Sequence, residues 1–136
     1  MSAFSNIPPQ AVLPLGAYDL DDLHKAALRA DQRWLMADLS GARDKAGVLR
    51  EIARSFGFPA HFGGNLDALY DCITDLSPDP SAEQPGFAVV LKGLPGEPGF
   101  PADDRDALLD VFRDAADHFF DRQTAFRVFY SVLGRP

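Results

Sequence analysis

The sequence has a single cysteine and no long apolar run, and these absences exclude several classes of protein. Cys72 has no second cysteine with which to form an internal disulfide or a zinc or redox site of the CxxC type. No segment approaches the roughly 18 consecutive apolar residues of a membrane-spanning helix. Residues 1–16 also lack the basic segment followed by an apolar run that is typical of a secretion signal. We therefore expect a cytoplasmic protein.

Basic residues are scarce in the middle of the chain. Residues 55–91 contain five acidic residues and no Lys or Arg, and residues 103–121 contain seven Asp against two Arg. The whole chain has a formal net charge of −7. Direct binding to nucleic acid or to an anionic membrane needs clusters of Lys and Arg, so both partners are disfavoured. The charge favours a basic partner.

The hydrophobic pattern alternates between strands and helices within a length of 136 residues, enough for one core. We expect strands over 34–39, 86–93 and 124–134. We expect helices over 19–30, within 41–58 with an end at Gly57, from Asn65 to about Leu76, and over 103–123. This order predicts an α/β fold with a three-stranded parallel sheet covered by helices. We divide the chain into an N-terminal extension with a short helix (1–33) and a main domain (34–136). Residues 1–16 are rich in proline, and we expect them to be poorly ordered or to lie along the surface.

The helix predicted after Asn65 carries an unusual acidic face. Asp67, Asp71 and Asp75 recur every four residues, on the side of the helix opposite Leu69 and Ile73. Like charges at this spacing repel by a few tenths of a kcal/mol per pair. The repulsion between these carboxylates therefore requires either a structural reason or a binding partner that pairs with them.

Two interpretations of this face remain open. It can be an ordinary solvated surface, as most surface helices have. It can instead be part of an interface, because no Lys or Arg is interleaved to pair with the carboxylates and the aromatic, glycine-containing turn HFGG precedes them. A second acidic stripe, Asp106, Asp110 and Asp114, recurs on the predicted long helix.

Catalytic and metal-binding patterns are missing. The three aspartates spread along one face instead of converging, and His24, His61 and His118 have no ligand spacing. There is no GxSxG motif, phosphate-binding glycine loop or GxGxxG fingerprint. We interpret Cys72 as a half-buried structural thiol. We expect no enzyme activity, no catalytic residues, no metal and no cofactor.

The stretch FPAHFGGNLDALYDCITDL resembles the signature of the barstar family, the intracellular inhibitors of barnase-type ribonucleases. The run from Asn65 to Leu69, then Asp71, Cys72 and Thr74, follows the family pattern at constant spacing. A weaker match, VFRD at 111–114, resembles the family's later helix. The predicted β-α-α-β-α-β order from residue 34 onward is also the order of this family.

The resemblance implies a site that binds a ribonuclease. Its residues are His61, Phe62, Gly63, Gly64, Asn65, Asp67, Tyr70, Asp71, Thr74, Asp75 and Asp114. In the family, the turn and the acidic helix enter the basic active site, and one aspartate, here Asp71, takes the place of a substrate phosphate. Asp67 supports it, His61 covers the ribonuclease's catalytic histidine, and Asp114 adds a distal carboxylate.

Four positions depart from the family pattern. His61 replaces a tyrosine, Gly64 a glutamate, Tyr70 a tryptophan and Asp75 a glycine. The first hypothesis is an inhibitor of a basic ribonuclease of the barnase type or a relative, monomeric when free. The alternative is a barstar-fold interaction module or immunity protein that binds a different basic protein or nuclease toxin.

Overall fold

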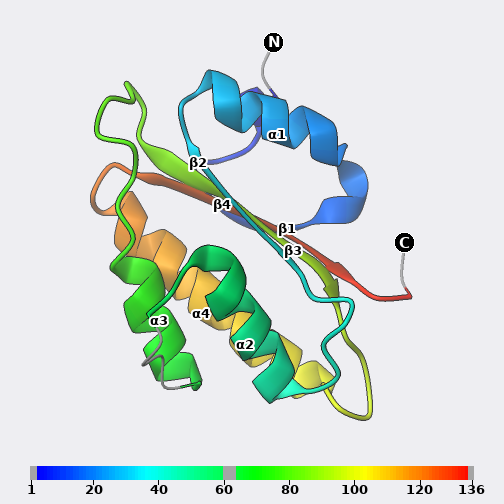
Figure 1. Cartoon of the computed structure of the whole chain (residues 1–136). Coiled ribbons are helices and arrows are strands. Elements are labelled where there is room, and N and C mark those ends of the chain that lie inside the picture. The colour runs from blue at the N-terminus through cyan, green and yellow to red at the C-terminus, as the bar shows by residue number, and fades with distance from the viewer. Residues whose placement is uncertain (1–2, 60–63, 135–136) are drawn as a thin grey trace.

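The computed structural model describes residues 3–59 and 64–134. Its elements are η1 (Ala3–Asn6), β1 (Gln10–Pro14), η2 (Leu15–Ala17), α1 (Leu20–Arg29), β2 (Arg33–Asp38), α2 (Lys45–Phe56), α3 (Leu66–Thr74), β3 (Gly86–Leu94), α4 (Ala102–Phe120) and β4 (Ala125–Val132). From β2 onward the order is β-α-α-β-α-β (Figure 1), which confirms the α/β prediction. Within the described ranges, no helix is long and apolar enough to cross a membrane.

The sheet has four parallel strands in the order β1-β4-β3-β2, so the prediction of three strands was wrong. The additional strand, β1, pairs with β4 from Gln10 opposite Phe126 to Pro14 opposite Tyr130. It lies in the segment that we expected to be poorly ordered. A run of five residues with proline at its end is too short for a periodicity signal. The strand β1 is formed by pairing with β4, which is distant in the sequence, so it cannot be recognised from local sequence alone.

One face of the sheet is covered by α2, α3 and α4 (Figure 1), and the larger core lies there. Fully buried side chains of this core include Leu49 and Ile52 from α2, Leu69 from α3, Phe112 from α4 and Phe87 from β3. The central strand β3 is buried throughout except at Lys92. A parallel strand with both faces covered reads as a continuous apolar run, which is how β3 was identified in the sequence.

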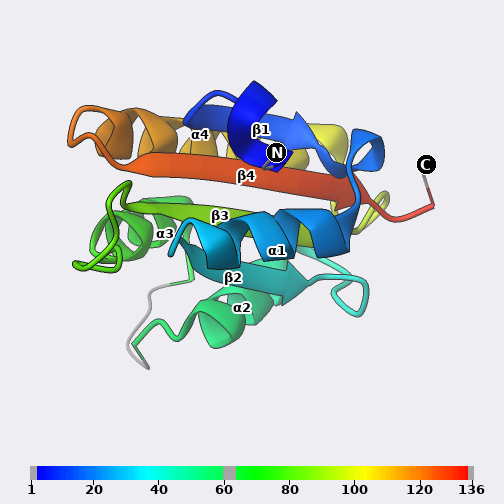
Figure 2. The same cartoon turned by 90° about the horizontal axis from the view of Figure 1, so that it is seen from above.

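The opposite face is covered by η1 and α1, which form a second core with the sheet (Figure 2). Leu23 and Ala27 of α1 and Phe4 of η1 pack with Ala88 of β3 and Phe129 of β4. The connection through α1 joins the two edge strands, β1 and β2, across this face. The N-terminal helix α1 thus covers the second face, and a parallel sheet needs both faces shielded from water.

Helix ends follow local signals in the sequence. Asp19 and Asp44 cap α1 and α2 by accepting hydrogen bonds from the N–H groups of Asp22 (3.1 Å) and Gly47 (2.8 Å). Gly57 ends α2 with φ of 73°, a left-handed conformation that glycine adopts without strain.

The apolar face of α4 is buried at Leu108, Phe112 and Phe119. Phe120, the last residue of the helix, is 51% exposed.

The second core predicts a large difference between two leucines of the same helix. Leu23 is fully buried and Leu28 is 64% exposed. We expect Leu23→Ala to lower the free energy of unfolding by about 2–5 kcal/mol, because it removes buried methyl groups and leaves a cavity. Leu28→Ala is the matched control and should change it by less than about 0.5 kcal/mol. Equal effects in urea unfolding would show that α1 does not belong to the cooperative unit.

Candidate functional site: an acidic groove between α3 and α4

The helix α3 is anchored in the large core by two residues of its inner face. Leu69 and Ile73 are buried, with 0% and 1% of their surface exposed. The side chains of Asp67, Asp71 and Asp75 are exposed on the outer face, as the spacing predicted. Because the two apolar residues must be buried, the carboxylates must face outward.

A groove of about 660 Å³ lies between α3 and α4. Its walls are formed by Leu66, Asp67, Tyr70, Asp71, Val111, Asp114, Asp117, His118, Asp121 and Arg122. The residues up to 71 come from α3, and those from 111 onward come from α4 and the turn that follows it. We call this surface the acidic groove.

Five carboxylates and one guanidinium line the acidic groove. Among the described residues the guanidinium of Arg122 forms no ion pair with them, and its Nη1 donates a hydrogen bond to the backbone oxygen of His118 at 2.8 Å. Asp117 accepts a hydrogen bond from Nε2 of Gln10 on β1. Among the described residues, no ion pair involves Asp67 or Asp71. The groove is therefore a region of concentrated negative potential.

The inner wall of the groove is partly apolar. Leu66, Tyr70 and Val111 are half-buried and pack against the large core. The Tyr70 ring meets the His118 ring edge to face, with centroids 6.4 Å apart. An apolar wall beneath carboxylates suits a long cationic side chain, whose methylene groups and charged end need different surroundings.

Four residues of the predicted site come together in the acidic groove: Asp67, Tyr70, Asp71 and Asp114. They were identified on two helices that are far apart in the sequence. The packing of α3 against α4 brings them to one surface.

Other predicted residues lie outside the groove. Asn65 caps α3, its side-chain oxygen accepting a hydrogen bond from the N–H of Ala68 at 2.8 Å. Thr74 donates its hydroxyl hydrogen to the backbone oxygen of Tyr70 at 2.9 Å. Asp75 is the C-cap of α3, and Gly64 is exposed with φ of 69°.

His61, Phe62 and Gly63 fall outside the described residues.

Two carboxylates of the groove, Asp117 and Asp121, were not predicted from the sequence. The acidic stripe noted on this helix was Asp106, Asp110 and Asp114, of which only Asp114 was a predicted site residue. Asp110 pairs with Arg113 at 2.8 Å, and Asp106 lies 3.6 Å from the Nε atom of Arg105.

Spacing of three and seven residues after Asp114 places Asp117 and Asp121 near it on a helical surface. This spacing is visible in the sequence, but the sequence does not show which side of α4 faces α3.

Cys72 is half-buried beside the acidic helix face. Burial raises the pKa of its thiol, and the carboxylates of Asp75 and Asp71 raise it further because they disfavour a thiolate. A thiol of raised pKa is a poor nucleophile at neutral pH. This fits the interpretation of Cys72 as a structural residue.

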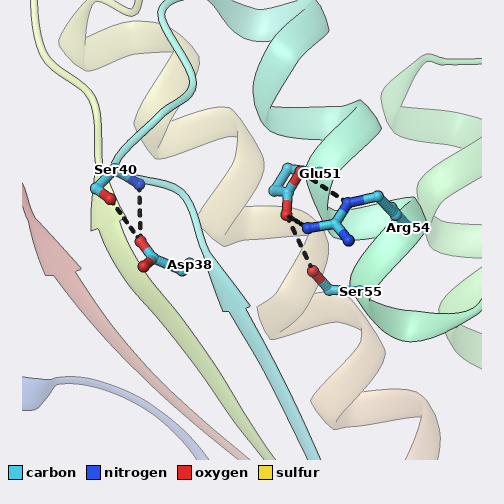
Figure 3. Close-up of polar contacts among 5 residues, drawn as sticks. All are labelled: Asp38, Ser40, Glu51, Arg54 and Ser55. Carbon is cyan, nitrogen blue, oxygen red and sulfur yellow. Dashed lines mark hydrogen bonds and ion pairs between the residues drawn. The ribbon is translucent and has the colours of Figure 1, made fainter.

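A separate polar cluster lies where β2 ends and along α2 (Figure 3). The hydroxyl and the N–H of Ser40 donate to Asp38 at 2.7 and 3.1 Å and lower the pKa of its carboxyl group. Arg54 donates to Glu51 and lowers the pKa of that carboxyl group as well. Lowered pKa values keep both groups ionised at neutral pH, whereas a general acid needs a raised one.

Nothing in the described part of the chain groups three or more His, Cys, Asp or Glu residues in a way that could hold a metal ion. The aspartates of the acidic groove line its walls without converging on one point.

Comparison with known proteins identifies one family. The sequence model of the family described as Barstar (barnase inhibitor) matches residues 32–131, which includes both walls of the acidic groove. A search of curated proteins gives no match. The family match begins just before β2, so β1 and α1 lie outside it.

The cap of α3 gives a prediction at the base of the site. Asn65→Ala should lower the free energy of unfolding by about 1 kcal/mol, because the N–H of Ala68 loses its partner. Asn65→Asp is the matched control and should keep the stability, since aspartate accepts the same hydrogen bond and favours the positive end of the helix dipole. Chemical denaturation measures both. If Asn65→Asp is as unstable as Asn65→Ala, the cap is not what Asn65 contributes.

Proposed function

The chain belongs to the barstar family, and from this premise we propose that it inhibits a basic ribonuclease by covering the enzyme's active site. The contact surface consists of the turn before α3, the outer face of α3 and the side of α4 that faces it. The observation that carries the proposal is the acidic groove, where five carboxylates meet one guanidinium that is turned onto its own helix.

The electrostatics of RNA cleavage support this function. An enzyme that binds the phosphates of RNA needs a cationic active site, and the acidic groove offers the complementary potential. The carboxylates of α3 and α4 repel one another in the free protein. Binding to cations relieves that repulsion. The relief of this unfavourable electrostatic energy therefore contributes to the binding free energy.

The residues have different roles in this proposal. Asp71, on the α3 wall of the groove, takes the position of a substrate phosphate, and Asp67 pairs with a second cation. Asp114 is the distal carboxylate from α4, and Tyr70 provides an apolar contact. The groove adds Asp117 and Asp121, which extend the acidic surface along α4.

The remaining predicted residues complete the surface. His61, Phe62, Gly63 and Gly64, which precede α3 in the sequence, also contact the enzyme in this proposal, and Asp75 lies at the margin of the contact surface. The partner is a ribonuclease of the barnase type or a relative, bound by a chain that is cytoplasmic and monomeric when free, without a cofactor.

The test is a titration of ribonuclease activity with the protein and two matched variants. Wild-type protein should abolish the activity of a barnase-type ribonuclease at an equimolar ratio. Asp71→Asn should weaken binding by about 2–5 kcal/mol, a range based in part on complexes of this same family, because it leaves a cation unpaired in the enzyme.

Asp21→Asn is the control for net charge. Asp21 is exposed on α1, which covers the other face of the sheet. Its replacement removes one negative charge and should leave inhibition unchanged. If Asp71→Asn inhibits as well as Asp21→Asn does, the groove does not bind the active site. If wild-type protein leaves the enzyme fully active, that enzyme is not the target.

Salt should act mainly on the association rate. Raising the ionic strength from about 0.05 to 0.5 M shortens the Debye length to a few ångströms, so long-range attraction is lost. We expect the association rate constant in stopped-flow measurements to fall by about tenfold or more, with a smaller change in dissociation.

Neutralising the α4 wall should reduce this salt dependence. The variant with both Asp114→Asn and Asp121→Asn should have a shallower slope than Asp21→Asn. An association rate that does not respond to salt would contradict electrostatic attraction through the groove.

A further inference from the structure

A second cavity of about 570 Å³ lies at the amino ends of β3 and β4, on the described part of the surface. Its walls are formed by Pro9, Gln32, Glu83, Gln84, Pro85, Phe120, Gln123, Thr124, Ala125 and Arg127. None of these residues lines the acidic groove. We call this space the Arg127 cavity. Its volume falls within the range of about 300–1,000 Å³ that is usual for small-molecule sites.

Arg127 is the unusual member of the wall. It lies on β4 opposite Ala11 of β1 and Ala88 of β3, and only 8% of its surface is exposed. Its guanidinium carbon lies 4.7 Å from the centre of the Phe4 ring. Burial lowers the pKa of this guanidinium, yet an arginine remains charged in a protein. A positive charge is thus removed from water at the inner end of the cavity.

The partners of Arg127 are neutral oxygens. Its Nε and Nη2 atoms donate to the backbone oxygen of Ile7 at 3.3 and 3.2 Å, and Nη1 lies 3.5 Å from the side-chain oxygen of Gln32. No ion pair among the described residues includes Arg127. A buried cation without an anion carries a desolvation cost that neutral acceptors offset only in part.

The three hydrogen bonds use Nε–H, one N–H of Nη1 and one N–H of Nη2. Nε and Nη2 form the side of the group that faces Ile7. Each terminal nitrogen keeps one further N–H that these bonds do not use, and a carboxylate can accept two parallel hydrogen bonds from a guanidinium. A planar carboxylate therefore matches both the charge and the shape of what Arg127 still lacks.

Part of the outer wall of the cavity is apolar, beside the exposed polar side chains of Glu83, Gln84 and Gln123. Phe120 is 51% exposed, an unusual exposure for a large aromatic residue at the end of a helix that is otherwise well packed. Pro9 and Pro85 also line the cavity. This combination of a buried cation and an exposed aromatic ring describes a ligand with an anionic end and an apolar body.

We propose that the Arg127 cavity binds a small organic acid, with its carboxylate on Arg127 and its apolar body against Phe120. Gln32 and Thr124 provide further polar atoms near the carboxylate, since both line the cavity and are buried. Glu83 lies at the exposed margin and opposes the anion by its charge. The site is independent of ribonuclease binding, because it shares no residue with the acidic groove.

The experiment compares benzoate with benzamide, which has the same ring and nearly the same shape but no charge. Uniformly ¹⁵N-labelled wild-type protein is titrated with each compound in NMR, with sodium chloride keeping the ionic strength constant. Benzoate should give saturable shifts of the Arg127 Nε–H signal and of the backbone signals of Thr124 and Ala125. Its affinity should exceed that of benzamide by about tenfold or more, because only benzoate forms charge-assisted hydrogen bonds.

Acetate and two surface variants test the other parts of the site. Acetate should bind more weakly than benzoate, because it has no ring to lie against Phe120. Phe120→Ala should weaken benzoate several-fold and leave acetate unchanged, and Glu83→Gln should tighten both acids. Both residues are exposed, so the variants keep the fold.

Three results would overturn the proposal. They are equal affinity for benzoate and benzamide, shifts that are not saturable or that chloride reproduces, and saturable shifts confined to residues outside the cavity. All three are measured on wild-type protein. Arg127→Lys adds a further check where it folds, because lysine keeps the charge but loses the planar edge and should weaken benzoate.

Discussion

The burial of Leu69 and Ile73 in the large core is the constraint on which the rest of the site depends. A helix of nine residues has one inner face, and these two side chains occupy it. The carboxylates of α3 must then point outward, and the neighbouring helix α4 completes the groove with its own aspartates. The core of the protein thus fixes the direction of its charge, and the large apolar core stabilises an arrangement that electrostatic repulsion alone would disfavour.

Repulsion between the carboxylates of the acidic groove lowers the stability of the free protein. Binding surfaces commonly lower stability in this way, because the arrangement that suits a partner is not the most stable one for the free protein. Elsewhere on the described surface, aspartates are engaged locally: Asp38 by Ser40, Asp110 by Arg113 and Asp44 as a helix cap. Asp67 and Asp71 of the groove differ from these carboxylates, because neither forms an ion pair among the described residues, and this contrast separates structural acids from candidate binding acids. Composition alone does not distinguish them, because all of them contribute equally to the net charge of −7.

The two faces of the sheet have different relations to the family. The face covered by α2, α3 and α4 carries the groove and lies within the family match. The other face is closed by η1 and α1, which precede that match, and β1 adds an edge strand beside β4. Arg127 contacts this N-terminal part, since Ile7 accepts its hydrogen bonds and Phe4 lies over its guanidinium. The N-terminal residues are therefore integrated into the fold, and Pro9 forms part of the wall of the Arg127 cavity.

Local signals in the sequence determined most of the elements and part of the site. Caps at Asp19 and Asn65, the glycine stop at Gly57 and the apolar run of β3 are read over a few residues, so they are visible without a structure. The same holds for the outward direction of Asp67 and Asp71. Three features depended on contacts between distant residues: the pairing of β1 with β4, the position of α1 over the second face, and the side of α4 that faces α3. That last contact selected Asp117 and Asp121 over Asp106 and Asp110. A helix carries polar residues on a broad part of its surface, and only the packing of its neighbours decides which of them share a groove.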